Sequence, residues 1–159
     1  MFATFTERAR AVMRLAERES HRRQHEHLGT EHILYTLVRE RTSVGANVLT
    51  NLGVDLDAVK RELESRFAPP SVGAGGGRPS YTPRAKEAVA TAIDEAAEFG
   101  HQYVGTEHLL LGLLAADGSA SARVLGMAGV VIDEVREEIV NLLGLPDLSA
   151  DDPTIVFGN

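Results

Sequence analysis

Apolar side chains recur at steps of three and four residues along most of the chain, which is the spacing of one face of an α-helix. One such set is Ala85, Ala88, Val89, Ala92, Ile93 and Ala96. A second set nearer the N-terminus is Ala9, Val12, Met13 and Ala16. Strand-like alternation of apolar and polar residues is absent from the sequence, so the pattern predicts an all-α fold.

The chain repeats itself after 76 residues without a gap. Gly29-Thr30-Glu31-His32 returns as Gly105-Thr106-Glu107-His108 in the same order. The same shift pairs Thr6 with Thr82, Ala16 with Ala92, His25 with His101 and Val59 with Val135. Agreement in one register over about sixty positions indicates a tandem duplication.

Each copy predicts four helices. Thr82-Pro83 has the order of an N-cap followed by a first helical residue, and the shift assigns the same capping role to Thr6. A second helix should begin at Thr30 and at Thr106. The third should cover about 44–52 and 120–128 and end at Gly53 and Gly129, and the fourth about 56–66 and 132–143. The prediction is therefore eight helices in two four-helix units related by a pseudo-twofold axis.

The predicted domain covers residues 1–145, with repeat one at 1–67 and repeat two at 81–145. Between them, the glycine-rich segment at 68–80 is predicted to be a flexible linker from its composition. It is not a phosphate-binding loop of the Walker type, because no Gly-Lys-Ser/Thr follows it. The tail at 146–159 is predicted to be flexible.

Composition and charge narrow the class of protein. A formal net charge of −7 and a pI near 5.3 disfavour nucleic acid and anionic membranes as partners, since both attract basic surfaces. The sequence has no cysteine, which excludes disulfides and thiolate chemistry. It has no apolar run of the length that a membrane span needs and no signal-peptide pattern, so a cytoplasmic location is expected.

The repeated Thr-Glu helix start carries the most specific chemistry. A glutamate in the first turn of a helix is favoured by the helix dipole alone, which is one explanation of Glu31 and Glu107. The other is a binding site, because helix N-termini bind anions and a carboxylate can hold a guanidinium through two hydrogen bonds. The caps Thr6 and Thr82, if the fold brings them to these glutamates, would suit a ligand that carries both a phosphate and a guanidinium.

Histidines raise the alternative of a metal site. Four fall within twelve positions, at His21, His25, His27 and His32. The second copy keeps only His101 and His108, whereas an inherited metal site would keep its ligands. No HExxH pattern and no G-x-S-x-G nucleophile motif occur in the sequence. We therefore predict structural or exposed imidazoles, no metal, no cofactor and no catalytic residue.

Aromatic residues precede the first helix of each copy. Phe5 and Tyr81 stand directly before the caps, where hydrophobic staples occur. Phe2 has no helical partner in the pattern and is expected to be exposed, as in a peptide-binding or partner-binding surface.

The phrases FTERAR at 5–10, YTPRAKEA at 81–88 and GTEHIL/GTEHLL at 29–34 and 105–110 resemble the N-terminal domain of Clp/Hsp100 unfoldases, especially the ClpC branch of Gram-positive bacteria. The resemblance covers about residues 1–145. It implies an eight-helix double repeat that in full unfoldases precedes two ATPase modules, so no ATP hydrolysis is expected within these residues and the chain is not expected to be an enzyme.

The resemblance also implies a recognition module that receives unfolded or phosphoarginine-bearing proteins and adaptors for the ClpC–ClpP degradation machinery. Phosphoarginine would bind at two sites, with Thr6 paired to Glu31 and Thr82 paired to Glu107. Cyclic peptide antibiotics such as cyclomarin would bind between the repeats, through contacts similar to Phe2, Arg10, Tyr81 and Lys86.

The sequence departs from the family pattern at several places. Gln24 replaces the glycine that normally precedes His25, and Tyr81 stands where the family usually has phenylalanine. The segments RERTSVGA and AADGSASA lack the family phrase EGEGVAA. These departures favour a stand-alone paralogue. The alternatives are the N-terminal fragment of a full ClpC unfoldase that delivers substrates to its own ATPase rings, and a metal-dependent or hydrolytic enzyme that uses the histidines.

Overall fold

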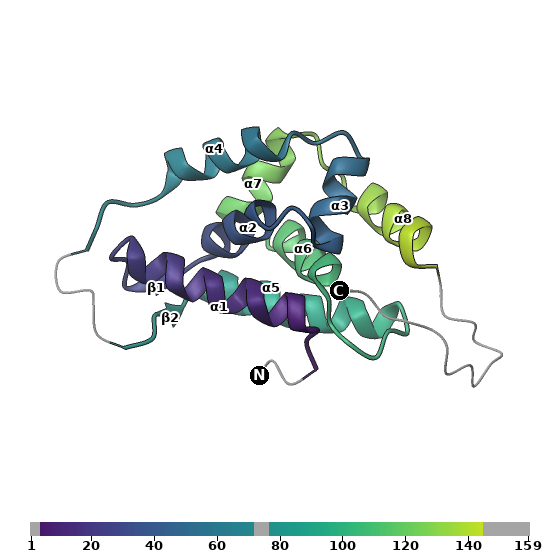
Figure 1. The fold of residues 1–159 in the computed structure, drawn as a ribbon, viewed down its shortest axis with the longest axis horizontal. Coiled ribbons are helices and arrows are strands. Elements are labelled where there is room, and N and C mark those ends of the chain that lie inside the picture. Colours follow the sequence, from purple (N-terminus) through teal and green to yellow (C-terminus); the bar gives the residue numbers. More distant parts are fainter. Residues whose placement is uncertain (1–3, 72–76, 145–159) are drawn as a thin grey trace.

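The computed structural model describes residues 4–71 and 77–144 (Figure 1). Repeat one forms α1 (Glu7–Arg22), β1 (His27–Leu28), α2 (Thr30–Arg39), α3 (Val44–Asn51) and α4 (Leu56–Arg66). Repeat two forms β2 (Ser80–Tyr81), α5 (Pro83–Glu98), α6 (Thr106–Ala115), α7 (Ala120–Met127) and α8 (Ile132–Leu143). The described part of the chain thus confirms the predicted eight helices in two four-helix units, and it adds two short strands that the sequence pattern did not indicate.

The helices begin and end where local sequence predicts. The hydroxyl of Thr6 accepts a hydrogen bond from the N–H of Ala9 at 3.1 Å, and Thr82 caps α5 through Ala85 at the same distance. Gly53 follows α3 with a φ of 85°, a left-handed conformation that glycine adopts without strain. These local signals set the lengths of the helices before any packing between them is considered.

The core lies around α2 and α6, which Figure 1 shows between the long helices α1 and α5 and the remaining helices. Both are buried along almost their whole length. A Cβ at Gly112 would lie 2.0 Å from the carbonyl oxygen of Ala88, so α5 and α6 approach at a distance that only glycine permits. Close packing of this kind explains why repeat two has a glycine in a helix, where it otherwise costs stability.

Reciprocal contacts show the pseudo-twofold relation of the repeats. The N–H of Gly45 in α3 donates to the hydroxyl of Thr106 at 2.9 Å, and the N–H of Ser121 in α7 donates to the hydroxyl of Thr30 at 3.3 Å. In the same way α4 packs on α7 and α3 packs on α8. Each repeat is therefore completed by elements of the other.

Backbone pairing also crosses between the repeats. Strands β1 and β2 are parallel, and the N–H of Thr82 donates to the carbonyl of Leu28 at 2.9 Å. In the counterpart, the N–H of Thr6 donates to the carbonyl of Val104 at 2.9 Å. Phe5, expected to act as a staple, is 2% exposed and belongs to the core beside this pairing. The start of the first helix in one repeat is thus fixed beside the start of the second helix in the other.

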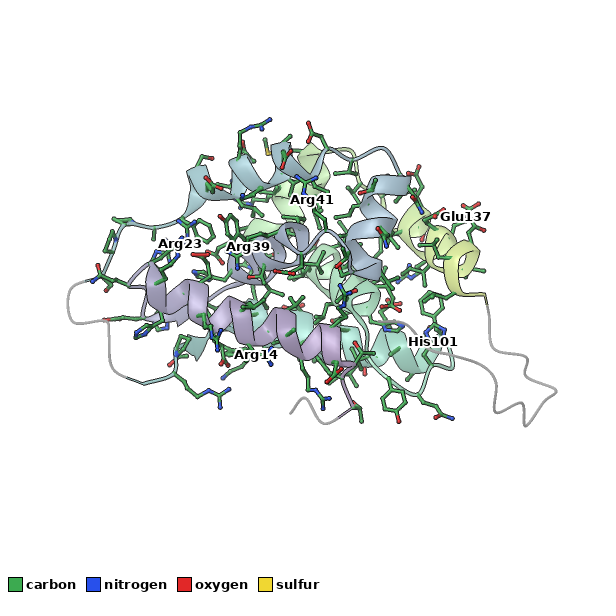
Figure 2. All side chains as sticks on the ribbon, viewed as in Figure 1. Arg14, Arg23, Arg39, Arg41, His101 and Glu137 are labelled. Atoms are coloured by element: carbon green, nitrogen blue, oxygen red, sulfur yellow. The ribbon has the colours of Figure 1, made fainter. Side chains whose placement is uncertain are left out.

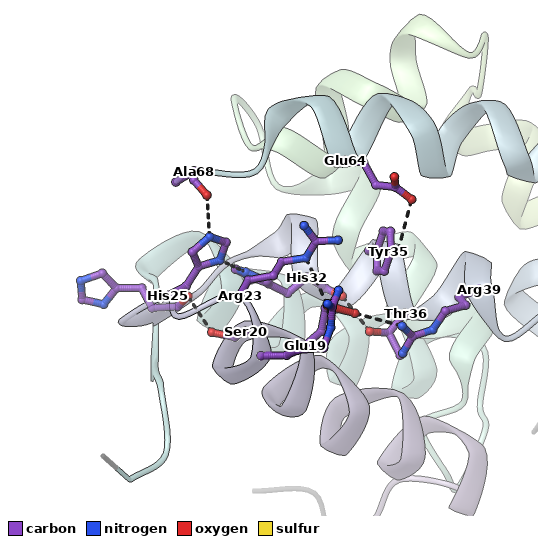
Figure 3. A network of polar contacts seen from close by, with 12 residues as sticks. Glu19, Ser20, Arg23, His25, His32, Tyr35, Thr36, Arg39, Glu64 and Ala68 are labelled. Carbon is purple, nitrogen blue, oxygen red and sulfur yellow. Dashed lines mark hydrogen bonds and ion pairs between the residues drawn. The ribbon is translucent and has the colours of Figure 1, made fainter. Parts of the chain in front are cut away.

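A buried ionic cluster joins α1 to α2 in repeat one. Glu19 is buried and its carboxylate contacts Arg22 at 2.6 Å, Arg23 at 3.1 Å and Arg39 at 2.9 Å (Figures 2 and 3). Burial favours a raised pKa for Glu19, but hydrogen bonding and the charges of the three arginines outweigh it and lower the pKa. The guanidinium of Arg23 also lies 3.9 Å from the ring centre of Phe67, which links the cluster to the end of α4.

Several predicted features lie outside the described residues. These are Phe2, the linker positions 72–76 and the tail at 146–159. Within the described residues, no single helix is long and apolar enough to cross a membrane. Helices α6 and α7, which meet at a bend of 94°, have the length and composition only when taken together.

Gln24 is the one described non-glycine residue with a positive φ, at 58°, and Gly100 has a φ of 73° at the equivalent place in repeat two. We predict that Gln24→Gly raises the free energy of unfolding by about 1 kcal/mol, because a left-handed conformation is strained for residues with a Cβ. Urea unfolding measures the change. The matched control Gln102→Gly should lower stability through added chain entropy, and equal effects of the two substitutions would contradict the prediction.

Candidate functional site

A relay of hydrogen bonds through two histidines fixes the start of α2 (Figure 3). The N–H of Gly29 donates to Nδ1 of His32 at 2.9 Å, Nε2 of His32 lies 2.8 Å from Nδ1 of His25, and Nε2 of His25 lies 2.7 Å from the carbonyl of Ala68. All three contacts are satisfied when both rings are neutral and carry their protons on Nε2. Burial, helped by the charges of His25 and Arg23, lowers the pKa of His32 to about 4.

Repeat two has the same arrangement. The N–H of Gly105 donates to Nδ1 of His108 at 2.9 Å, and His101 lies 2.8 Å from the other nitrogen of that ring. Burial first, and then the charge of His101, lower the pKa of His108 to about 3. These four rings hold the starts of α2 and α6 through hydrogen bonds. No group of three His, Cys, Asp or Glu side chains in the described parts of the chain is placed to hold a metal ion.

A pocket of about 410 Å³ opens where α2 and α5 begin. Its lining includes the carboxylate-bearing Glu31 from repeat one and the cap Thr82 from repeat two. A Cβ at Gly29 would lie 1.9 Å from Oε1 of Glu31, so glycine at this N-cap leaves room for the carboxylate to fold over the start of the helix. The pocket therefore combines a partly exposed acid, a hydroxyl and the N-terminal ends of two helices.

The pairing of these residues differs from the one that the family resemblance implied. Thr82 lines the pocket of Glu31, whereas the resemblance paired it with Glu107. The backbone hydrogen bond from Thr82 to Leu28 is the cause, because it holds the start of α5 against the start of α2. By the same crossing, Thr6 is fixed to Val104, directly before the start of α6.

The start of α6 is closed to solvent at Glu107, whereas the start of α2 opens into the pocket at Glu31. Glu107 is 0% exposed, and neither of its carboxylate oxygens has a hydrogen-bond partner among the described residues. Burial raises the pKa of Glu107 to about 7. An ionised carboxylate in this position would lack both water and a counter-ion, so burial disfavours the charged form of Glu107.

Of the residues that the resemblance assigned to antibiotics, the three that the structure describes lie on two helices and a strand. Arg10 is exposed on α1 and lines a hollow of about 480 Å³ with Glu7, Arg8 and Arg14. Lys86 is exposed on α5. The hydroxyl of Tyr81 donates to Glu17 of α1 at 2.9 Å. Burial first, and then this contact, raise the pKa of the tyrosine.

Sequence reasoning missed part of the first pocket. Ala68, Pro69, Pro70 and Ser71 line it, although the sequence assigned them to a linker without a role. The N–H of Ser71 donates to the carbonyl of Gln24 at 2.8 Å, which holds this segment at the pocket. No periodicity or motif in the sequence signals this contact, since it depends on where the end of α4 lies.

The fold and these paired helix starts define a known class of recognition domain. The chain matches the Clp repeat (R) N-terminal domain over residues 4–92 and 80–153, and it belongs to this family.

Individual relatives are similar over nearly the whole chain. The negative regulator of genetic competence ClpC/MecB of Bacillus subtilis (strain 168) is 43% identical over 147 residues, which cover 91% of this chain and 18% of the relative. The chaperone protein ClpB of Oceanobacillus iheyensis is also 43% identical, over 148 residues, with the same two shares. The chain thus spans about a fifth of the length of these relatives.

Solved structures share the fold at low identity. The N-domain of ClpV from Vibrio cholerae superposes with a TM-score of 0.77 at 20% identity, covering 89% of this chain and 86% of that one. A complex of a ClpV N-domain with a VipB peptide gives a TM-score of 0.74 at 20% identity, with 87% and 86% covered. The Hsp104 N-terminal domain from Candida albicans gives 0.75 at 16% identity, with 88% and 91% covered.

Glu107→Gln tests the buried carboxyl. Because the pKa of Glu107 is raised from 4.5 to about 7, its contribution to stability is fully present below pH 4.5 and is lost as the pH rises through 7. The unfolding free energy of E107Q minus that of the unaltered protein should therefore increase with pH, by up to about 1.4 kcal/mol per pH unit in this window. Urea unfolding from pH 4.5 to 8 measures it. Glu134→Gln, at an exposed first-turn carboxylate of α8, is the matched control, and a difference that stays constant for E107Q would refute the assignment.

The histidine relays predict an unfolding free energy that falls as the pH falls in the acid range. This is opposite to the effect of Glu107, which lowers stability as the pH rises. The pKa values of His32 and His108 fall from 6.5 to about 4 and about 3, so the stability that they contribute is present above pH 6.5 and is lost as the pH falls through the folded-state values. In E107Q the unfolding free energy should accordingly decrease from pH 6.5 to 4. NMR titration of the ring protons checks the cause directly. Protonation of both rings near pH 6.5 in the folded protein would be incompatible with this account.

Proposed function

We propose that this chain is a non-catalytic recognition module of the Clp type, which binds phosphoarginine-marked or unfolded protein segments and adaptors for the ClpC–ClpP machinery. Membership of the Clp repeat family and 43% identity to a ClpC support this class of function. The solved complex of a ClpV N-domain with a VipB peptide supports peptide binding by this fold.

The observation that carries the proposal is the pocket shared by Glu31 and Thr82. In phosphoarginine the phosphate is bonded directly to the guanidinium, so a receptor needs an acid and an anion site side by side. Glu31 would accept two N–H groups of the guanidinium. The phosphate would lie at the start of α5, where the N–H of Arg84 has no intrahelical acceptor, since Pro83 lacks an N–H and Thr82 already caps the N–H of Ala85.

Thr82 contributes to this site in two ways. One lone pair of its hydroxyl already accepts the N–H of Ala85, which fixes the side chain at the helix start. The hydroxyl proton is not used by that bond and can be donated to a phosphate oxygen. The cap is therefore held in place before a ligand arrives, which reduces the entropy lost on binding.

Thr6 and Glu107 form the second proposed site. Glu107 is fully buried and its carboxylate oxygens lack partners, so a guanidinium that reaches it would replace a missing interaction. Closure of this start implies that the second site binds only after local opening, and more weakly than the first. The two sites of the duplicated domain are thus proposed to be unequal.

Phe2, Arg10, Tyr81 and Lys86 remain the proposed contacts for cyclic peptide antibiotics. The recognition site serves equally in a stand-alone adaptor and in the N-terminal domain of a longer unfoldase, and we favour the stand-alone form from the departures in sequence. We place this function in the cytoplasm and propose neither a cofactor nor an enzymatic activity for the chain.

Calorimetric titration of free phosphoarginine at pH 7.5 tests the first site. Glu31→Ala should weaken binding at least tenfold, because it removes the only proposed partner of the guanidinium. Thr82→Ala should weaken it about fivefold, which corresponds to one hydrogen bond of about 1 kcal/mol. Glu134→Ala, which also removes a first-turn carboxylate, should leave the affinity within twofold. Unchanged binding in E31A, or equal losses in E31A and E134A, would overturn the site assignment.

A further inference from the structure

A row of arginines runs along the exposed face of α1. Arg10, Arg14, Arg18 and Arg22 follow one another at intervals of four residues, which places them on one side of the helix. Arg22 pairs with the buried Glu19. The side chains of Arg10, Arg14 and Arg18 are exposed and make no hydrogen bond or ion pair to any other described residue (Figure 2 labels Arg14).

This row does not help α1 to form. Like charges at a spacing of four residues destabilise a helix by a few tenths of a kcal/mol for each pair. Arg10 also lies near the N-terminal end of the helix, where the dipole disfavours a positive charge. The chain therefore keeps these arginines at some cost to the stability of α1.

The duplication supplies an internal comparison. In α5 the positions equivalent to the row are occupied by Lys86, Ala90, Asp94 and Glu98. Helices α1 and α5 have the same length and equivalent buried faces. A row of arginines is therefore not a requirement of this helix in this fold, and it belongs to repeat one alone.

The row borders a hollow of about 490 Å³ between α1 and the chain that leads into β2. Arg14, Arg18, His21, Arg22 and Arg78 line it, with Glu17 as the one acidic residue in the lining. That acid is already used, because it accepts hydrogen bonds from Arg78 at 2.7 Å and from the hydroxyl of Tyr81 at 2.9 Å. The hollow consequently keeps the unpaired positive charges of Arg14 and Arg18.

We propose that this face of α1 is a second recognition surface, which binds an acidic segment of a partner protein. Arg10 and Arg18 are eight residues apart, or about 12 Å along the helix, which is the length of about four residues of extended peptide. Aspartate and glutamate side chains fit arginine through two parallel hydrogen bonds. Nucleic acid fits less well, since the chain has a net charge of −7 and would repel a long polyanion outside this row.

This surface is independent of the phosphoarginine pocket, because Arg14 and Arg18 do not line that pocket. The probe is a fluorescein-labelled dodecapeptide of alternating aspartate and glutamate. Its binding is measured by fluorescence anisotropy at 50 and 200 mM salt. The unaltered protein should bind it, with affinity falling at the higher salt. The double variant R14A/R18A should bind at least tenfold more weakly and should keep its affinity for phosphoarginine.

The matched control is R61A/R123A, which removes two exposed arginines from α4 and α7 and leaves the same net charge. It should bind the peptide within twofold of the unaltered protein. Equal weakening in both double variants would overturn the proposal, because the attraction would then be general. So would binding of a 12-base-pair DNA duplex as tightly as the peptide, or an unchanged affinity in R14A/R18A.

Two further measurements separate this inference from the proposed function and from a loss of folding. The Glu31→Ala variant should bind the acidic peptide with unchanged affinity. Loss of peptide binding in this variant would show that the peptide occupies the phosphoarginine pocket instead. Thermal unfolding of R14A/R18A should give a midpoint no lower than that of the unaltered protein, since removing like charges from α1 relieves repulsion. A folded R14A/R18A that binds the acidic peptide normally would end the case for this surface.

Discussion

Two backbone hydrogen bonds between the repeats determine which helix starts lie side by side. Thr82 donates to the carbonyl of Leu28, and Thr6 donates to the carbonyl of Val104. Each bond holds the capped start of a long outer helix against the start of a core helix from the other repeat. Since these N–H groups precede the helices and have no partner within them, the bonds satisfy donors that the fold would otherwise have to expose. A single repeat would possess caps and acids but no pocket between them.

The buried polar side chains differ in whether they have hydrogen-bond partners within the protein. Histidine relays satisfy the N-caps of α2 and α6, and three arginines satisfy Glu19. Among the buried side chains that the structure describes, only the carboxylate oxygens of Glu107 have no hydrogen-bond partner. An unpaired buried acid is costly, and such groups persist mainly where function requires them. This contrast within one core supports the proposal of a guanidinium at that position.

The duplication is strict in the helix caps, the histidine pairs and the contacts between core helices, and relaxed in the charged contacts. The histidine pairs, the caps and the reciprocal bonds of Thr30 and Thr106 occur in both halves at nearly equal distances. Charged contacts have diverged: Glu95, the counterpart of Glu19, pairs instead with Arg136 of α8 at 2.6 Å. The arginine row on α1 is a further divergence of this kind. Packed cores tolerate little change in volume, which explains why the contacts between core helices agree in both repeats. Surface charges can change at small cost, which explains why the arginine row occurs on α1 alone.

The sequence by itself determined the helices, the duplication and the residues with suitable chemistry. Periodicity, caps and terminal glycines act over three to five neighbouring residues, so they can be read from a single chain. The identity of Glu31, Glu107 and the two threonines as candidate residues was available in this way. Which threonine meets which glutamate was not. That choice depends on a crossing between segments more than fifty residues apart, whereas the family resemblance implied a pairing within each repeat. Only the tertiary structure also decided that one acid lies in an open pocket and the other in the core, because burial is a property of the packed molecule and both glutamates occupy the same local sequence.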